Sequence, residues 1–138
     1  MFKATTRFLI VDDFSTMRKV IKKALFDLGY ENVIEAADGV KGYELLEKFA
    51  LTSEPVEIIM SDWNMPNMMG IDLLKKCRVE ARFKTLPFIL ITAESEQSQI
   101  IEAVKAGVSD YVIKPFSPST LKGKLEIVFK KTNTGSAA

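Results

Sequence analysis

The strongest constraint on the fold is an alternation, along the whole chain, between short apolar runs and segments of helical periodicity. Five runs of four to six residues have the length and apolar character of buried strands. Between and after them, apolar residues recur three and four positions apart, as in amphipathic helices. Helices that alternate with strands cover both faces of a parallel sheet. We therefore predict an α/β fold, a doubly wound five-stranded parallel sheet, with strands at Arg7–Val11, Asn32–Ala36, Val56–Ser61, Pro87–Thr92 and Tyr111–Lys114.

Five apolar stripes predict the helices. Glycines at positions 29 and 107 fall where the first and fourth stripes end, as is typical of helix C-termini. The single cysteine, Cys77, fits a buried position of the third stripe, and a lone cysteine excludes an internal disulfide. The stripes are, in chain order, Val20, Ile21, Ala24, Leu25 and Leu28; Val40, Tyr43 and Leu46; Leu73, Leu74 and Cys77; Ile100, Ile101 and Val104; and Leu121, Leu125, Val128 and Phe129.

The length of 138 residues is that of one domain. We predict a single domain over residues 1–131 and a disordered tail over residues 132–138, which are small and polar and show no periodicity. The net charge of +1 gives no basic surface for nucleic acid or an anionic membrane. The apolar runs are too short to cross a bilayer, and the N-terminus lacks a signal-like stretch. These features predict a cytoplasmic protein, which we expect to be a monomer, with protein or small-molecule partners.

Histidine is absent from the sequence. Its absence removes the commonest metal ligand and the commonest general base among side chains, and it excludes a phosphohistidine on this chain. Any chemistry that the protein performs must therefore use carboxylates, hydroxyls and lysines.

Chemically active side chains stand at the carboxyl ends of the predicted strands, where ligands bind in such sheets. Three carboxylates held close together repel one another, so without a cation at least one should have a raised pKa. A divalent ion removes that conflict, and Mg²⁺ suits carboxylate and carbonyl ligands beside a phosphate. One carboxylate then remains available as a nucleophile. The residues at these strand ends are Asp12 and Asp13, then Asp62, Thr92 and Lys114.

Each of these residues alone has an ordinary structural explanation. Asp13 or Ser15 could cap the helix that follows the first strand, and Asp62 could simply open a loop. Thr92 is of a type common in strands. The combination favours a functional site, because a random chain seldom places all five residues at successive strand ends of one doubly wound pattern.

Four stretches of the sequence resemble the response-regulator receiver family: FLIVDDFSTMRK from Phe8, DWNMPNM from Asp62, TAE from Thr92 and YVIKPF from Tyr111. They spread over nearly the whole chain. The segments 14–17 and 63–67 resemble the chemotaxis branch of that family. The resemblance implies a flavodoxin-like sheet with the strand order 2-1-3-4-5.

The resemblance also implies a metal site and a phosphoacceptor. Asp62 is implied to accept a phosphoryl group on its carboxylate. Mg²⁺ is implied to be bound by Asp13, Asp62 and the backbone carbonyl of Asn64, with Asp12 acting through a bound water.

The remaining implied roles concern the phosphoryl group and the response to it. The hydroxyl of Thr92, the backbone amide of Ala93 and the ammonium of Lys114 are implied to contact phosphoryl oxygens. Tyr111 is implied to turn inward on activation and so to alter the surface around the fourth helix and the fifth strand.

The family also implies partners. The phosphoryl donor is expected to be a separate sensor histidine kinase of the CheA type, because this chain has no P-loop and no glycine-rich nucleotide motif. The protein is expected not to be an enzyme, apart from self-phosphorylation from a donor and slow self-dephosphorylation. In the chemotaxis branch, the implied target is a flagellar motor switch protein of the FliM type. The implied partner face comprises Ile100, Val104, Tyr111, Ile113 and Lys124, of which Ile100 and Val104 could instead be core residues.

Three departures from the chemotaxis pattern bear on these expectations. Met69 stands where that branch usually has an acid, but it lies outside the implied ligand set. Glu96 and Gln97 stand where a relative carries lysines, which affects partner recognition. The segment Lys48–Pro55 is longer than usual and is expected to be a surface loop.

Three alternative functions remain open at the level of sequence. A single-domain phosphorelay shuttle would pass phosphate to a second phosphotransfer protein. A flavodoxin-like FMN carrier is disfavoured, because its phosphate would meet three acids. A magnesium-dependent phosphatase is disfavoured, because the segment after Asp62 lacks a second acid to protonate a leaving group.

Overall fold

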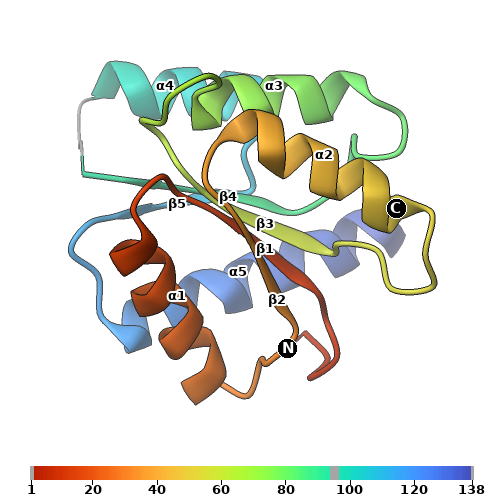
Figure 1. The fold of residues 1–138 in the computed structure, drawn as a ribbon, viewed down its shortest axis with the longest axis vertical. Coiled ribbons are helices and arrows are strands. Elements are labelled where there is room, and N and C mark those ends of the chain that lie inside the picture. Colours follow the sequence, from red (N-terminus) through yellow and green to blue (C-terminus); the bar gives the residue numbers. More distant parts are fainter. Residues whose placement is uncertain (1, 94–96, 138) are drawn as a thin grey trace.

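The computed structural model describes residues 2–93 and 97–137. Strands and helices alternate from the N-terminus to the C-terminus, and the five strands form one parallel sheet in the order β2-β1-β3-β4-β5 (Figure 1). Both the predicted fold and the implied strand order are confirmed. The elements are β1 Phe8–Val11, α1 Ser15–Asp27, β2 Val33–Ala36, α2 Gly39–Ala50, β3 Ile58–Asp62, α3 Gly70–Val79, β4 Phe88–Thr92, α4 Gln97–Ala106, β5 Asp110–Ile113 and α5 Pro118–Ala137.

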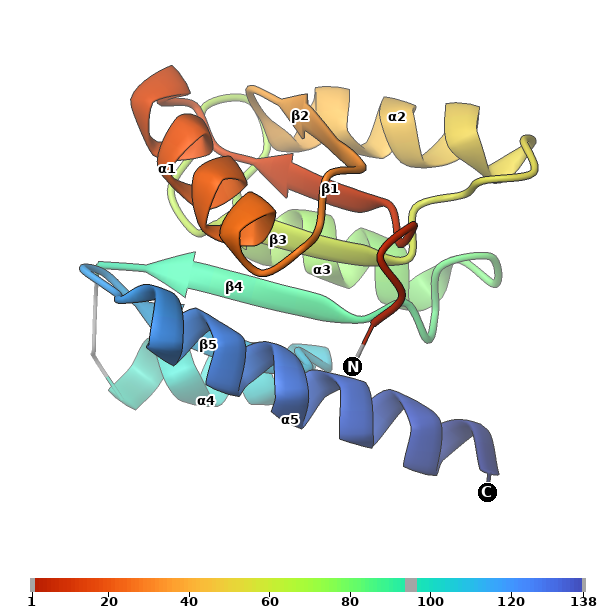
Figure 2. The same ribbon diagram turned by 90° about the horizontal axis from the view of Figure 1, so that it is seen from below.

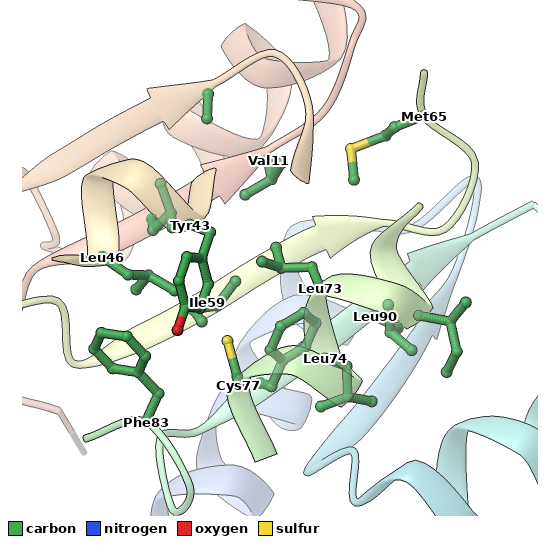
Figure 3. Packing of buried hydrophobic residues seen from close by; sticks show 14 of the residues in the cluster. Val11, Tyr43, Leu46, Ile59, Met65, Leu73, Leu74, Cys77, Phe83 and Leu90 are labelled. Atoms are coloured by element: carbon green, nitrogen blue, oxygen red, sulfur yellow. The ribbon is translucent and has the colours of Figure 1, made fainter. Parts of the chain in front are cut away.

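Helices cover the sheet on both faces, with α1 and α5 on one side and α2, α3 and α4 on the other (Figures 1 and 2). Successive residues of a strand point to opposite faces, so each strand supplies both cores. In β1, Leu9 and Val11 pack under α2 and α3, whereas Phe8 and Ile10 pack under α1 and α5. Figure 3 shows the core between the sheet and helices α2 and α3, in which Leu73, Leu74 and Cys77 of α3 are buried.

Several residues of the predicted helical stripes are exposed. Val20 is 49% exposed and Val40 is 40% exposed, so these two members of the predicted apolar stripes do not lie on the buried faces of their helices. The physical reason is the helical repeat: in α1 the buried positions are Ile21, Ala24 and Leu25, and Val20 lies about 100° around the helix from Ile21. Apolar composition alone does not identify the buried face.

Two helix ends differ from the sequence prediction. Helix α2 extends to Ala50, so the first part of the predicted surface loop Lys48–Pro55 is helical. Helix α5 continues to Ala137, through residues for which a disordered tail was expected. The Thr132 hydroxyl donates a hydrogen bond of 2.9 Å to the carbonyl of Val128, which adds a local contact within this extension. Within the described part of the chain, the helices are all too short or too polar to cross a membrane.

The register of the sheet brings the functional candidates together. Val11 pairs with Ser61 across β1 and β3, so the residues that follow each of them, Asp12 and Asp62, are neighbours at the carboxyl edge. On the far side of β3, Asp62 pairs with Ile91, one residue before Thr92. Parallel strands thus carry all of these side chains to one edge of the sheet.

Candidate functional site

Three carboxylates converge at the carboxyl edge of the sheet. Asp12, Asp13 and Asp62 each offer one oxygen, and these oxygens lie within 4.8 Å of one another. Asp12 is fully buried and Asp62 is buried, whereas Asp13 is partly exposed. The grouping predicted from the strand ends is therefore present in the structure.

The Asp12–Asp13 pair does not cap helix α1. The N-cap residue is Phe14, which provides no side-chain hydrogen bond, so the alternative that Asp13 or Ser15 caps this helix is wrong. Instead, the Asp12 carboxylate accepts a hydrogen bond of 2.9 Å from the backbone amide of Phe14 through Oδ1. This leaves Asp12 Oδ2 and Asp13 Oδ1 buried and without a hydrogen-bond partner among the described residues.

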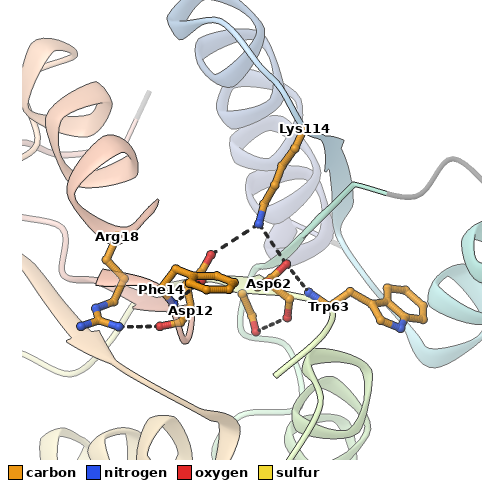
Figure 4. A network of polar contacts seen from close by, with 7 residues as sticks. Asp12, Phe14, Arg18, Asp62, Trp63 and Lys114 are labelled. Atoms are coloured by element: carbon orange, nitrogen blue, oxygen red, sulfur yellow. Dashed lines mark hydrogen bonds and ion pairs between the residues drawn. The ribbon is translucent and has the colours of Figure 1, made fainter. Parts of the chain in front are cut away.

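Lys114 bridges two of the three acids (Figure 4). Its ammonium lies 3.2 Å from Asp62 Oδ1 and 3.6 Å from Asp12 Oδ2. Asp62 Oδ1 also accepts a hydrogen bond of 2.9 Å from the backbone amide of Trp63. The lysine follows β5 directly, and its position beside the acids confirms the expected convergence from a third strand.

The pKa of the Asp62 carboxyl is raised above its ordinary value. Burial is the main cause, and the negative charge of Asp12 acts in the same direction, while Lys114 opposes both. The expectation that one acid of the cluster has a raised pKa is therefore confirmed. Desolvation contributes more than the repulsion between acids on which that expectation rested.

The acidic group fits a divalent metal ion on two grounds. Three carboxylates face one ammonium, which leaves two negative charges uncompensated within the group. The buried Asp13 Oδ1 has no hydrogen-bond partner among the described residues, and Asp12 Oδ2 has only its ion pair of 3.6 Å with Lys114. Buried acceptors without hydrogen bonds are costly unless something binds them. A hard cation that takes oxygen ligands satisfies both requirements.

The remaining residues of the predicted site lie at the end of β4 and in the loop between β3 and α3. Thr92 is buried at the last position of β4, and Ala93 follows it on the surface. Asn64 is exposed in the loop 63–69 between β3 and α3. Met69 is the N-cap residue of α3 and packs, partly buried, against the core.

The predicted partner face differs in exposure from residue to residue. Val104 is 63% exposed and Ile113 is 39% exposed, so the alternative that Val104 is a core residue is wrong. Ile100 is partly buried and, with Tyr111, lines a small hollow of about 10 Å³. The Lys124 ammonium lies 3.2 Å from Asp110 Oδ1 and 5.0 Å from the centre of the Tyr111 ring, so its charge is already compensated.

Of the two adjacent departures Glu96 and Gln97, the structure describes only Gln97. Gln97 is exposed at the first position of α4. Glu96 lies outside the described residues.

Sequence reasoning missed three residues that support the site. Arg18 donates a hydrogen bond of 2.6 Å to the backbone carbonyl of Asp12 (Figure 4) and another of 3.1 Å to Glu35. It thereby holds the loop that carries Asp12 and Asp13. Asn67 and Asp38 form a side-chain hydrogen bond between the loop 63–69 and α2. The motifs around Phe8 and Asp62 contain Arg18 and Asn67, but nothing in the sequence pairs them with their partners.

Comparison with known proteins agrees with the fold. Residues 8–126 match the response regulator receiver domain. The chain belongs to that family.

Similarity to individual proteins extends over most of the chain. Chemotaxis protein CheY1 of Helicobacter pylori is 50% identical over 122 residues, which cover 88% of this chain and 95% of the relative. Chemotaxis protein CheY of Pseudomonas aeruginosa is 48% identical over 127 residues, covering 92% and 98%. The solved structure of the chemotaxis response regulator CheY4 of Vibrio cholerae has a TM-score of 0.79 at 32% identity and covers 89% of this chain and 98% of that one. These similarities confirm the chemotaxis branch and a single-domain response regulator.

Proposed function

We propose that the protein is a phosphorylation-driven switch in which Asp62 accepts a phosphoryl group from a phosphohistidine of a sensor kinase. The observation that supports this proposal is the position of the Asp62 carboxylate, between Lys114 and two further acids at the carboxyl edge of the sheet. An oxygen of Asp62 forms a bond to phosphorus while the phosphorus–nitrogen bond of the donor breaks. The imidazole leaves with the electron pair and takes up a proton, and the product is an acyl phosphate.

The neighbouring residues have proposed roles that suit this chemistry. The Lys114 ammonium neutralises one phosphoryl oxygen, and the Thr92 hydroxyl and the Ala93 amide donate hydrogen bonds to others. Phosphoryl transfer depends on positioning and charge neutralisation more than on a strong base. A chain without histidine can therefore carry out this step.

Mg²⁺ is the cofactor that we assign to the acidic group. Asp13, Asp62 and the backbone carbonyl of Asn64 would hold the ion, and Asp12 would act through a bound water. The uncompensated charge of the group and its two buried carboxylate oxygens without hydrogen bonds support a hard divalent cation. When bound, the ion neutralises negative charge on the transferred phosphoryl group.

Tyr111 is the proposed reporter of phosphorylation. Thr92 and Tyr111 line the same small hollow between β4, β5 and α4. An inward turn of Tyr111 would bring its ring further into this hollow, against Ile100 and Ala103 of α4. A movement of Thr92 toward the phosphoryl group would thus change the surface formed by α4 and β5.

The partners that we propose are those of a chemotaxis regulator in the cytoplasm. A CheA-like sensor histidine kinase would supply the phosphoryl group, and a FliM-like flagellar motor switch protein would bind the phosphorylated form. Val104 and Ile113 offer exposed apolar contact area for such a target.

Phosphorylation of two matched variants tests the acceptor. Asp62→Asn should abolish labelling by acetyl phosphate and by a phosphorylated histidine kinase, because it removes the nucleophilic oxygen. Asp72→Asn, which removes an exposed carboxylate from the first turn of α3, should be labelled at the wild-type rate. A base-labile phosphoryl group that forms on Asp62→Asn at the normal rate would show that the acceptor lies elsewhere.

A further inference from the structure

We propose that Asp38 and Asn67 are positioning residues for the magnesium and phosphoryl site. The inference rests on the proposed function, since it concerns the loop that carries the assigned carbonyl ligand, Asn64. Asn67 lies in the same loop, and its Nδ2 donates a hydrogen bond of 2.9 Å to Oδ2 of Asp38. Asp38 is the N-cap residue of α2, so this bond ties the loop to a packed helix.

Asp38 provides a rigid anchor because both of its carboxylate oxygens are engaged. Oδ1 accepts a hydrogen bond of 2.9 Å from the backbone amide of Lys41 and caps the helix. Oδ2 accepts the bond from Asn67, and the residue is only 4% exposed. The pKa of this carboxyl is lowered, chiefly by the Lys41 amide. Asp38 is therefore ionised at neutral pH, and the helix fixes the direction of its second oxygen.

The loop needs such an anchor at Asn67. Asn67 has a φ of 66°, and among the described residues it is the only one other than glycine with a positive φ. Asparagine reaches this left-handed conformation more readily than most residues, but still at a cost. The hydrogen bond to Asp38 favours the conformation that the loop adopts here.

A second contact holds the next residue of the loop against the same helix. A Cβ atom placed on Gly39, the first residue of α2, would lie 2.8 Å from both the side chain and the carbonyl oxygen of Met68. Only glycine permits this close approach. At the other end of the loop, the Gly70 amide donates to the carbonyl of Trp63 at 2.9 Å. The turn that contains Asn64 is thus fixed at both ends, and its carbonyl is pre-positioned for a metal ion.

Two substitutions remove the bond between Asp38 and Asn67 and leave the local structure in place. Asp38→Ser keeps a side-chain oxygen for the helix cap but is too short to reach Asn67. Asn67→Gly keeps access to positive φ and removes the amide. Asn32→Gly is the matched control, because it removes an asparagine amide that donates to the Thr5 carbonyl, before β1 begins and away from the acidic edge.

The Mg²⁺ dissociation constant, measured by calorimetry, should rise about tenfold in Asp38→Ser and in Asn67→Gly, the effect typical of residues that orient metal ligands. The double variant should lose no more than either single variant, because both remove the same bond. The exchange Asp38→Asn with Asn67→Asp restores one donor and one acceptor at equal net charge, and it should return the affinity toward the wild-type value. Asn32→Gly should bind Mg²⁺ like the wild type.

Urea unfolding of every variant separates a loss of positioning from a loss of folding. Wild-type Mg²⁺ affinity in both single variants would overturn the inference and leave the proposed function intact, provided that the wild type binds Mg²⁺ and is phosphorylated on Asp62. Additive losses in the double variant would also overturn it, because they would show that the two side chains act separately. A wild-type protein that binds no Mg²⁺ would overturn the proposed function, and this inference with it.

Discussion

Asp62 carries a carboxylate that its surroundings make costly to ionise. Burial and the neighbouring Asp12 favour the protonated form, while Lys114 and the amide of Trp63 favour the charged form. The balance raises the pKa of the Asp62 carboxyl. Ionisation of Asp62 is therefore coupled to the cation and the phosphoryl group that are proposed to bind beside it. The buried, ionised carboxylate of Asp62 lowers the stability of the fold, but it is suited to the proposed acceptance of a phosphoryl group.

The raised pKa of Asp62 predicts the sign of a pH effect on stability in the absence of divalent ions. A carboxyl whose pKa is higher in the folded state stabilises that state most at acidic pH, and this contribution is lost as the pH rises through the folded-state pKa. The free energy of unfolding of Asp62→Asn, relative to wild type, should therefore increase from acidic to neutral pH. Urea titrations in a chelator measure this difference, and a difference that falls with pH would contradict the assigned shift.

Trp63 allows the metal site to be observed directly. It is the only tryptophan, it is buried, and its backbone amide donates to Asp62. Mg²⁺ should change its fluorescence, and Asp13→Lys should raise the Mg²⁺ dissociation constant by about tenfold or more, since even loss of an outer-shell partner has an effect of that size. Asp72→Lys, on an exposed position, serves as the control. An unchanged dissociation constant in Asp13→Lys would argue against the assigned ligand.

At the scale of elements, the junction between β3 and α3 is the most tightly constrained part of the site. A Cβ atom on Gly70, the first residue of α3, would lie 2.0 Å from the carbonyl oxygen of Asp62. The helix can therefore start this close to the acceptor strand only because residue 70 is glycine. The strand end and the helix start act as one unit that sets the backbone of Asp62.

Two glycine-to-alanine substitutions test this constraint. Gly70→Ala should cost about 3 kcal/mol of stability by overpacking and should lower the rate of phosphorylation by displacing the Asp62 backbone. Gly123→Ala, in α5, meets nothing within 4 Å and should instead stabilise the protein by about 0.5–1 kcal/mol through helix propensity. Urea unfolding and acetyl phosphate labelling measure both effects, and equal stabilities for the two variants would refute the steric argument.

At the scale of the whole molecule, the acidic edge and the proposed output face are connected through β4, β5 and α4. Thr92 ends β4 beside the acids, and Tyr111 in the neighbouring strand lines the same hollow as Ile100 of α4. The exposed apolar residues Val104 and Ile113 lie on these elements. A change at the acidic edge can therefore reach a surface without crossing the rest of the sheet.

Binding of a flagellar switch peptide tests this connection. Beryllofluoride, a mimic of the phosphoryl group, should raise the affinity of the wild type for the peptide, by up to about tenfold to a hundredfold if one hydrogen bond to a charged group drives the change. Tyr111→Ala should show a much smaller increase. The affinity should depend only weakly on salt, because the Lys124 charge is paired with Asp110. Equal wild-type affinity with and without beryllofluoride would favour the phosphorelay shuttle, in which this face is not the output.

Much of the fold could be predicted because its determinants are local or follow chain order. Apolar runs and helical stripes marked all five strands and all five helices, and parallel strands necessarily carry their carboxyl ends to one edge. That geometry alone predicts that Asp12, Asp13, Asp62 and Lys114 lie close together at the carboxyl edge of the sheet. The buried face of each helix was less predictable. In α1, for example, Val20 is exposed although it is as apolar as the buried Ile21 and Leu25.

The sequence by itself determined the architecture, the acidic edge and the set of groups available for chemistry, because each follows from residue type and order along the chain. Only the tertiary structure decided which side chains from separate elements contact one another. The bond of Asn67 to Asp38, 29 positions apart, and the pairing of Lys124 with Asp110 are examples. Such contacts depend on how separate helices and loops settle on the sheet, and no local pattern encodes the distance between them.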